Sequence, residues 1–566
     1  MESYKNDVAL ILSKYINIDI EKIKELVETP NKKGFGDLAF PTFTQAKEYR
    51  KAPPLIAKEI VDSLEELPQT ISKAENVGPY INFYINNSVL IEKTVKEVLD
   101  KGANYGGEDQ GEGKTVVIDF SAPNIAKPFG IGHLRSTVIG NSLYKIHEFF
   151  GYKVVGINHI GDWGTQFGKV IVAYDKWGND DELERDPVKY LYQLYVKFHD
   201  EAEKNPDLEE EAREVFKELE EGVDDRVKKW KLFRELSLAE YNRIYEKLNV
   251  TFDSFKGEQF YNDKMTDTIE TLISKGITEI SKGALIINLD MFDIPPVLLR
   301  KKDGATLYAT RDLCAAIYRK ETYDFDKMLY VVGSEQSLHF KQLFKALAIA
   351  GFEWHKDCQH VPFGLFRFKE QKMSTRKGTL IFLDEVLSKA EQLTKDIIEE
   401  KNPNLPNKDE VARQVGIGAI IFGDLSNDRV KDVVFDWDKI LDFNGETAPY
   451  VQYSHARICS ILRKHSGQIT NWDASLMKSE YEFGLAKRIA NFNVVINDAL
   501  RDLKPSIVAR YLLDLAKDFN RFYHNCPVLK EENDSLKGAR LKLIAATGQV
   551  LKNGLSLLGI EAPEEM

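Results

Sequence analysis

The clearest hydrophobic pattern lies in the first third of the chain. Thr115–Phe120 is a β-branched apolar run typical of a buried strand, and Tyr152–Ile160 is a second such run. Between them, from His133 onward, apolar residues recur at helical spacing. The pattern therefore predicts a strand–loop–helix–strand unit with its loop, Ser121–Gly132, at the carboxyl edge of a parallel sheet. Nucleotides bind at such edges, because the N–H groups of a helix start are exposed there.

Further apolar runs follow later in the chain. Gly283–Leu289 and Val297–Arg319 indicate that the sheet resumes, with a strand that ends over Thr306–Thr310 and a helix that begins at Arg311. Met328–Leu347 is typical of a buried strand, a glycine turn and a helix. We expect these segments to face the same cleft as the first loop.

The remaining patterns divide the chain into parts. Residues 1–110 are predicted to form a small α+β domain, and residues 111–400 an α/β domain with a charged helical insertion at about 180–260. Residues 401–445 are expected to be a helical stem, and residues 446–566 an all-α domain. In the first part, the run Val77–Ile85 alternates like an exposed strand.

Composition narrows the class of protein. The 566 residues are 43% hydrophobic and 29% charged, as in an ordinary globular protein, and no apolar stretch reaches membrane-spanning length. The first residues lack the features of a signal peptide, and the four cysteines are isolated, so we expect a cytoplasmic protein with no metal site. Acidic residues concentrate between Asp180 and Asp225, so the net charge of −12 constrains the partner only weakly.

The first loop carries candidate chemistry. It lacks the Gly-x-x-x-x-Gly-Lys-Ser/Thr spacing of a Walker loop. A dinucleotide fingerprint is disfavoured because Arg135 stands where a small residue is needed. What remains is a helix start opened by Gly130 and Gly132, with His133 beside it and Lys127 upstream. These groups suit a polyphosphate that is attacked at its α-phosphorus.

The stretch SAPNIAKPFGIGHLRST resembles the His-Ile-Gly-His region of class I aminoacyl-tRNA synthetases, and it is most similar to arginyl-tRNA synthetases. The later stretch KMSTRKG resembles their Lys-Met-Ser-Lys-Ser loop. The cleft segments occur in the family's order, and the resemblance covers nearly the whole chain. It implies a multidomain α/β fold with a Rossmann-like class I catalytic domain, an N-terminal tRNA-contacting domain and a C-terminal anticodon-binding domain.

The resemblance also implies roles for individual residues. The catalytic candidates are Lys127, His133, Lys372, Ser374, Arg376 and Lys377. The candidates for binding arginine are Asp119, Asn124, Tyr308, Asp312 and Gln336, and those for ATP are Gly130, Gly132, His133, Gly333, His339 and Met373. The candidates for tRNA are Tyr80, Asn82, Tyr450, Tyr453, Arg457, Asn520 and Tyr523. Taken singly, a carboxylate such as Asp312 is more often a helix cap, and an aromatic residue is more often part of a core.

The implied reaction is formation of arginyl-adenylate from L-arginine and ATP, with Mg²⁺ accompanying ATP, and then transfer to tRNA(Arg). Activation is expected to require tRNA, and we expect a monomer. Two positions depart from the class pattern: Gly130 replaces a histidine, and Thr375 replaces a lysine for which Lys127 can substitute. A non-catalytic tRNA-binding paralogue, disabled at Gly130, is the alternative. A class I synthetase for lysine or cysteine is a third possibility, and Asp119, Tyr308 and Asp312 disfavour cysteine.

Overall fold

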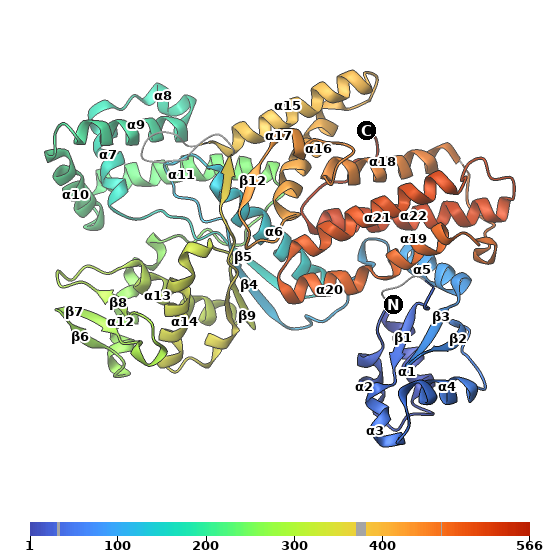
Figure 1. Ribbon diagram of the computed structural model, residues 1–566. Helices are drawn as coiled ribbons and strands as arrows, with labels where there is room; N and C mark the ends of the chain where they lie inside the picture. Colours follow the sequence, from blue (N-terminus) through green and yellow to red (C-terminus); the bar gives the residue numbers. More distant parts are fainter. Residues whose placement is uncertain (31–33, 369–380, 466) are drawn as a thin grey trace.

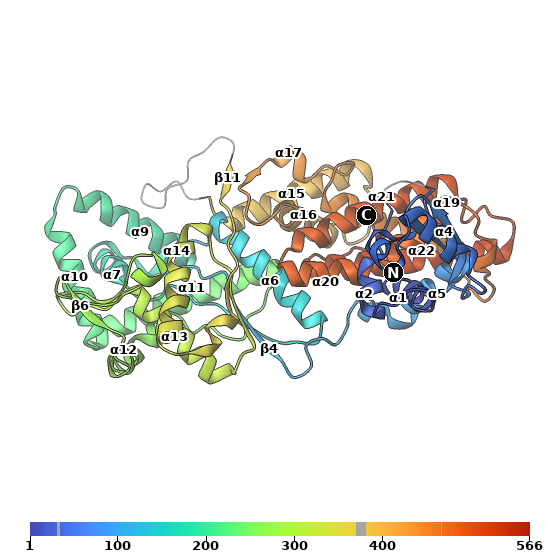
Figure 2. The same ribbon diagram turned by 60° about the horizontal axis from the view of Figure 1, so that its bottom comes forward.

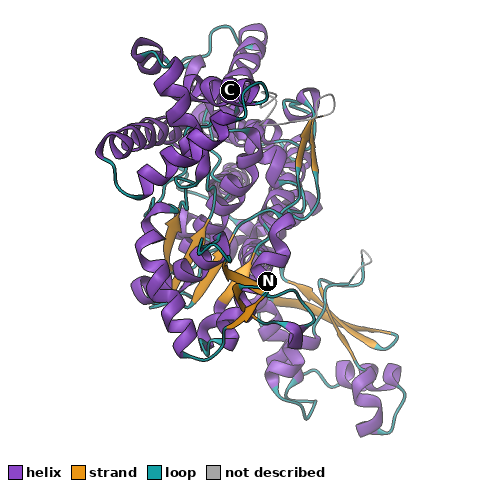
Figure 3. Cartoon of the chain, turned by 90° about the vertical axis from the view of Figure 1, so that its left-hand side faces the viewer, coloured by secondary structure: helices purple, strands orange, loops and turns teal. Residues whose placement is uncertain are grey.

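The computed structural model describes residues 1–30, 34–368, 381–465 and 467–566. The molecule is elongated, with helical units at both ends and a parallel sheet between them (Figure 1, Figure 2). Helices predominate, and the strands of the described residues form separate small sheets (Figure 3). No helix in this part of the chain is both long and apolar enough to cross a membrane.

The central sheet is parallel, with strand order β10-β9-β4-β5. Its strands are β4 (Thr115–Asp119), β5 (Lys153–Ile157), β9 (Lys327–Tyr330) and β10 (Cys358–His360). The helices that directly follow β4 and β9 along the chain are α6 (Leu134–Phe149) and α14 (Ser337–Ile349). The predicted strand–loop–helix–strand unit and the later strand–turn–helix segment are therefore confirmed.

Helix α6 is buried on several faces, because it contacts both the sheet and the C-terminal helices. Close packing on the sheet side depends on Gly140, since a Cβ atom there would lie 2.3 Å from the ring of Phe120. On another side, Arg135 forms an ion pair with Asp424 (Nε–Oδ1 2.7 Å), and both side chains are almost completely buried. Arg135 also donates hydrogen bonds to the carbonyls of Gly364 and Lys431. Arg135 thus joins α6 to Asp424 and to the backbone at Gly364 and Lys431, which follow the parallel sheet in the sequence.

The strands predicted to resume the sheet do not join it. They form a separate antiparallel sheet of β6 (Glu279–Ser281), β7 (Ala284–Ile287) and β8 (Val297–Arg300). This sheet shares a hydrophobic core with one side of β4 and β9. Helices α12 (Met265–Ser274) and α13 (Tyr308–Tyr323) belong to the same unit.

The segment predicted as a helical insertion, at about 180–260, is helical up to Lys247. It contains α8 (Asp180–Arg185), α9 (Pro187–Ala202), α10 (Asp207–Glu220) and α11 (Asp224–Lys247), and α7 (Thr165–Trp177) packs on it from just before its start. These helices lie at the end of the molecule opposite the C-terminal bundle (Figure 1).

The segment predicted as a helical stem is only partly helical. It includes α16 (Lys408–Leu425) and α17 (Trp437–Ile440), preceded by α15 (Leu383–Lys401). Between α16 and α17, β12 (Val433–Phe435) pairs in parallel with β11 (Phe366–Phe368), so the predicted helical stem or linker also contains a short strand. The C-terminal bundle consists of α18 (Ala448–His465), α19 (Glu480–Ala490), α20 (Phe492–Asp502), α21 (Pro505–Asn525) and α22 (Asp534–Leu557).

The N-terminal unit is an α+β domain with strand order β1-β3-β2. Its elements are α1 (Glu2–Leu12), α2 (Ile20–Leu26), β1 (Leu38–Pro41), α3 (Ala46–Tyr49), α4 (Pro53–Asp62), β2 (Ile71–Val77) and β3 (Tyr80–Ile85). Helix α5 (Asn87–Lys101) then leads toward the sheet and packs against α19 and α22 of the bundle.

The buried ion pair yields a stability prediction. Asp424→Asn should leave the Arg135 guanidinium buried without its counter-charge, which costs about 3 kcal/mol of unfolding free energy. Calorimetric thermal unfolding would measure the loss. As a control, Glu92→Gln breaks the exposed Glu92–Lys96 pair on α5 and should change stability by less than about 0.5 kcal/mol. Equal effects of the two variants would contradict the prediction.

Candidate active site

The loop that follows β4 is buried and has an unusual backbone. Ser121, Ala122 and Ala126 all have positive φ angles (74°, 48° and 58°), a region that L-residues rarely adopt. Side chains from other elements hold this backbone. The Ser121 N–H donates to Ser136 Oγ of α6 (2.9 Å), and the Ala126 N–H donates to Ser237 Oγ of α11 (2.9 Å).

Two tyrosines of α11 complete this support. The Tyr241 hydroxyl contacts the carbonyls of Asn124 (2.5 Å) and Lys127 (2.6 Å). The Tyr245 hydroxyl is hydrogen-bonded to Ser121 Oγ (2.8 Å). The insertion therefore supports the backbone of the loop Ser121–Gly132, the predicted nucleotide-binding loop, called the nucleotide loop below.

Next to the loop lies a cavity of about 600 Å³. All five predicted arginine-binding side chains line it: Asp119, Asn124, Tyr308, Asp312 and Gln336. The predicted ATP-binding residue His339 lines the same cavity. Asn124 can point into it because Gly161 lies beside it, where a Cβ atom would be only 2.1 Å from Asn124 Oδ1.

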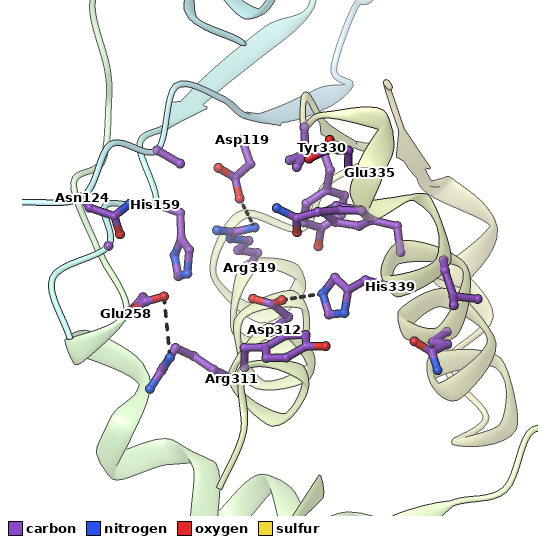
Figure 4. Close-up of a pocket in the computed structure, with 18 residues that line it drawn as sticks. Asp119, Asn124, His159, Glu258, Arg311, Asp312, Arg319, Tyr330, Glu335 and His339 are labelled. Atoms are coloured by element: carbon purple, nitrogen blue, oxygen red, sulfur yellow. Dashed lines mark hydrogen bonds and ion pairs between the residues drawn. The ribbon is translucent and has the colours of Figure 1, made fainter. Parts of the chain in front are cut away.

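Carboxylates and cationic or imidazole groups meet in pairs in this cavity (Figure 4). Asp119 Oδ2 lies 2.8 Å from Arg319 Nη1, and Asp312 Oδ2 lies 2.6 Å from His339 Nε2. A third, longer pair joins Glu258 Oε1 to Arg311 Nη1 at 3.7 Å. The cavity thus offers several carboxylates to a cationic ligand, each with a resident partner.

The pKa values of two of these carboxyl groups, Asp312 and Glu258, are shifted in opposite directions by their surroundings. Burial acts to raise the pKa of Asp312, but the hydrogen bond and charge of His339, with the charges of His159 and Arg319, leave that pKa below its usual value. Burial raises the pKa of Glu258 to about 7, because the charge of Arg311, 3.7 Å away, offsets the effect of burial only in part. Asp312 is therefore ionised at neutral pH, whereas Glu258 titrates there.

Sequence reasoning did not assign Arg319, Glu258 or Arg311 to this site. Arg319 lies on the same face of α13 as Asp312, seven residues later, and this spacing was the available signal. Glu258 lies in a loop after α11, and no local pattern connects it to the cavity.

The local structure around Tyr308 differs from the prediction. No strand covers Thr306–Thr310; α13 already begins at Tyr308, after Leu307 as N-cap. Tyr308 and Asp312 are therefore presented by successive turns of one helix rather than by a strand end. Tyr308 is 63% exposed, with its ring 5.1 Å from that of His339.

His133 lies at the start of α6, as predicted. Its Nδ1 is buried and has no hydrogen-bond partner among the residues that the structure describes. Burial, with a contribution from Lys127, lowers the pKa of His133, so its imidazole is neutral at pH 7. Gly132 beside it is exposed, and no described atom lies within 4 Å of its Cβ position, so a ligand can approach its backbone closely.

The basic-loop candidates Lys372, Met373, Ser374, Arg376 and Lys377 lie outside the described residues. Both flanks of that segment are described. On one side β11 ends at Phe368; on the other, Ile381 accepts a hydrogen bond from the N–H of Ile131 (3.0 Å). Gly130 forms a bridge with Phe382. The end of the segment is therefore attached to the glycine-rich helix start.

Lys127 lies in the nucleotide loop, with its ammonium 4.8 Å from the centre of the Tyr195 ring on α9. Gly333, another ATP candidate, is the N-cap of the short helix Ser334–Gln336 that precedes α14.

The tRNA candidates of the bundle form one cluster on α18 and α21. Arg457 Nη1 donates to Asn520 Oδ1 (2.9 Å), and Asn520 Nδ2 donates to the hydroxyl of Tyr450 (2.9 Å). The Arg457 guanidinium lies between the rings of Tyr453 (4.7 Å) and Tyr523 (5.5 Å), which are 40% and 39% exposed.

The N-terminal candidates behave differently from each other. Tyr80 begins β3 and packs edge-on against the exposed Phe43. Asn82 is only 2% exposed, which corrects the prediction of a shared exposed face. The backbone at Gly36 covers it, since a Cβ atom there would lie 3.2 Å from that of Asn82.

Comparison with known proteins identifies the family. The model of the class I (R) tRNA synthetase catalytic domain matches residues 94–437, the DALR anticodon-binding domain residues 451–566, and the arginyl-tRNA synthetase N-terminal domain residues 2–85. The chain belongs to the arginyl-tRNA synthetase family. The predicted fold class is confirmed.

Individual relatives agree with this family. The chain is 52% identical to an arginine–tRNA ligase of Clostridium beijerinckii over 563 residues and 50% identical to one of Clostridium botulinum strain Okra over 564, covering 100% of each chain. Its structure superposes on Thermus thermophilus arginyl-tRNA synthetase with a TM-score of 0.82 at 27% identity, covering 100% and 99% of the two chains. The Plasmodium falciparum enzyme shares the fold, with a TM-score of 0.80 at 23% identity.

Glu258 gives the site a testable pH dependence. Its pKa rises from 4.5 to about 7 in the fold, so the unfolded chain loses this proton first and stability falls as pH rises between those values. Glu258→Gln keeps a neutral side chain, so it should stabilise the protein by about 1–3 kcal/mol at pH 8 and by little at pH 4.5. Thermal unfolding across this pH range measures the difference.

The control is Glu335→Gln, which neutralises an exposed carboxyl group that lines the same cavity. A pH-independent difference between wild type and Glu258→Gln would contradict the assignment.

Proposed function

We propose that this chain activates L-arginine with ATP and transfers it to tRNA(Arg). A carboxylate oxygen of arginine attacks the α-phosphorus, the bond from that phosphorus to the bridging oxygen breaks, and pyrophosphate leaves. Arginyl-adenylate then esterifies the terminal ribose of tRNA, and AMP is released. The observation that carries the proposal is the convergence of Asp119, Asn124, Tyr308, Asp312 and Gln336 on one cavity beside the nucleotide loop.

The cavity suits a guanidinium ligand. A guanidinium group is planar and always charged, and it prefers carboxylates that accept two hydrogen bonds. Asp312 is ionised and lies one helical turn from the exposed ring of Tyr308, which offers a flat surface. Glu258 adds a carboxyl group that would ionise when a cation binds beside it. Asp119 is held by Arg319, so we expect it to act on the amino-acid end together with Asn124 and Gln336.

The helix start suits the phosphates of ATP. Accessible backbone at Gly132, the neutral imidazole of His133 and the ammonium of Lys127 lie on one loop and the first turn that follows it. Such preorganised donors stabilise charge that develops in the transition state. Lys372, Ser374, Arg376 and Lys377 would close on the departing pyrophosphate, and Gly333, His339 and Met373 would lie near adenosine.

Magnesium would arrive with ATP and neutralise phosphate charge. We expect no dedicated cage from the cavity carboxylates Asp119 and Asp312, because Arg319 and His339 each pair with one of their oxygens. For tRNA, the partly exposed rings of Tyr453 and Tyr523, with the Arg457 guanidinium beside them, offer stacking surfaces and positive charge to unpaired bases. In the N-terminal domain we retain Tyr80 as a candidate, but not Asn82, because its side chain is buried.

The decisive experiment is arginine-dependent ATP–pyrophosphate exchange, with and without tRNA(Arg), in wild type and Lys127→Ala. We expect exchange to require tRNA and to fall by about 10²–10³ in the variant, as on removal of one oxyanion donor. The control Lys197→Ala removes a lysine that also lies 4.8 Å from a ring, that of Trp177, outside the site, and should retain full exchange. No exchange in wild type, with tRNA binding intact, would instead favour a non-catalytic paralogue disabled at Gly130.

A second prediction concerns amino-acid recognition. Asp312→Asn should raise KM for arginine by about 10²-fold, because the guanidinium would lose a charged acceptor inside a cavity. Steady-state aminoacylation at varied arginine concentration measures this. Asp324→Asn, an exposed carboxylate at the end of the same helix, should leave KM unchanged. An unchanged KM in Asp312→Asn would remove Asp312 from the arginine site.

A further inference from the structure

The ammonium of Lys127 lies over an aromatic ring that comes from the insertion. Its Nζ is 4.8 Å from the centre of Tyr195, and Tyr195 is 8% exposed on α9. The ring of His199, one turn later on α9, packs edge-on against the Tyr195 ring at 4.6 Å. Cations are attracted to the face of such a ring, most strongly where water is excluded.

The backbone of Lys127 is held by the same insertion. Its carbonyl contacts the hydroxyl of Tyr241, and the neighbouring Ala126 N–H is bound by Ser237. Helices α9 and α11 pack on each other. The same pair of helices therefore contacts Lys127 at two points, its backbone carbonyl and its ammonium group. A lysine stem of four carbons is flexible, and it reaches one geometry reproducibly only if something restricts it.

We propose that Tyr195 is a positioning residue for Lys127: its ring holds the ammonium in place, so that the insertion sets where this cation meets the phosphates of ATP. The inference rests on the proposed role of Lys127 in adenylate formation. It gives the insertion a specific part in the chemistry beyond shaping the loop backbone.

An ordinary core tyrosine would behave differently from a positioning one. A core residue contributes to stability whether or not Lys127 is present. A positioning residue acts through Lys127, so its replacement should have no further effect once Lys127 is gone. A ring without the hydroxyl should also be sufficient, because the attraction comes from the ring face.

The experiment compares Tyr195→Leu and Tyr195→Phe, each alone and combined with Lys127→Ala, in tRNA-stimulated exchange with the full chain. Tyr195→Leu should lower kcat about tenfold and leave KM for arginine within about twofold, since the ring contacts the cation and not the arginine cavity. Tyr195→Phe should stay within about threefold of wild type. In the Lys127→Ala background, Tyr195→Leu should change kcat by less than about twofold.

The chain provides a matched control in the Lys197–Trp177 pair, which has the same 4.8 Å distance and uses a lysine of the same helix α9. Lys197→Ala should leave kcat and KM unchanged. Thermal midpoints of all variants show whether a loss of rate follows from a loss of folded protein.

Several outcomes would overturn the proposal. Equal losses from Tyr195→Leu with and without Lys127 would show that Tyr195 only supports the fold. A Tyr195→Phe variant as slow as Tyr195→Leu would place the effect in the hydroxyl group. If wild type shows no exchange, the proposed function fails and this inference fails with it. If Lys127→Ala is fully active, the proposed function stands, but the role of Lys127 fails and so does this inference.

Discussion

A buried loop without regular secondary structure must find hydrogen-bond partners for its backbone outside itself. Residues 121–132 form such a loop, with positive φ at three non-glycine positions. The partners come from two distant places, Ser136 on the following helix and the α11 residues Ser237 and Tyr241. The backbone of this predicted nucleotide-binding loop therefore depends on contacts between segments about a hundred residues apart. For this reason the insertion is part of the structural support of the loop beside the cavity.

Much of the architecture follows from local pattern. The β-branched apolar runs correctly predicted the strands that begin at Thr115 and Lys153, and the helical spacing correctly predicted α6. Such patterns are predictive because each element can bury its apolar side chains in essentially one way. The arginine-site candidates also converge on one cavity, although they come from β4, the loop after it, α13 and the turn before α14. The positions of Asp119, Asn124 and Gln336 follow from chain order, since the carboxyl ends of the parallel strands β4 and β9 meet at one edge. Tyr308 and Asp312 reach the cavity from α13, which follows the separate antiparallel sheet.

What the sequence could not supply depends on long-range contacts. The alternating pattern of Val77–Ile85 suggests that Asn82 is exposed, yet the Gly36 segment covers its side chain. The strand Val433–Phe435 is too short to recognise without its partner β11. The pairing of Arg319 with Asp119 links residues two hundred positions apart, and the raised pKa of Glu258 arises only from burial in the assembled cavity. Each of these features is a property of tertiary packing and not of any local window.

Hydrogen bonds that join α6 and Tyr105 to the C-terminal helices bear on how the chain folds during synthesis. Ser142 on α6 donates a hydrogen bond to the carbonyl of Leu557, 415 residues later, and the Tyr105 hydroxyl reaches Ile489, 384 residues later. At roughly 5–20 residues per second, the ribosome would deliver Leu557 about 20–80 s after Ser142. Through that interval one side of α6 has no cover. The packing of α6 in the nascent chain is thus complete only when the C-terminal helices have been synthesised.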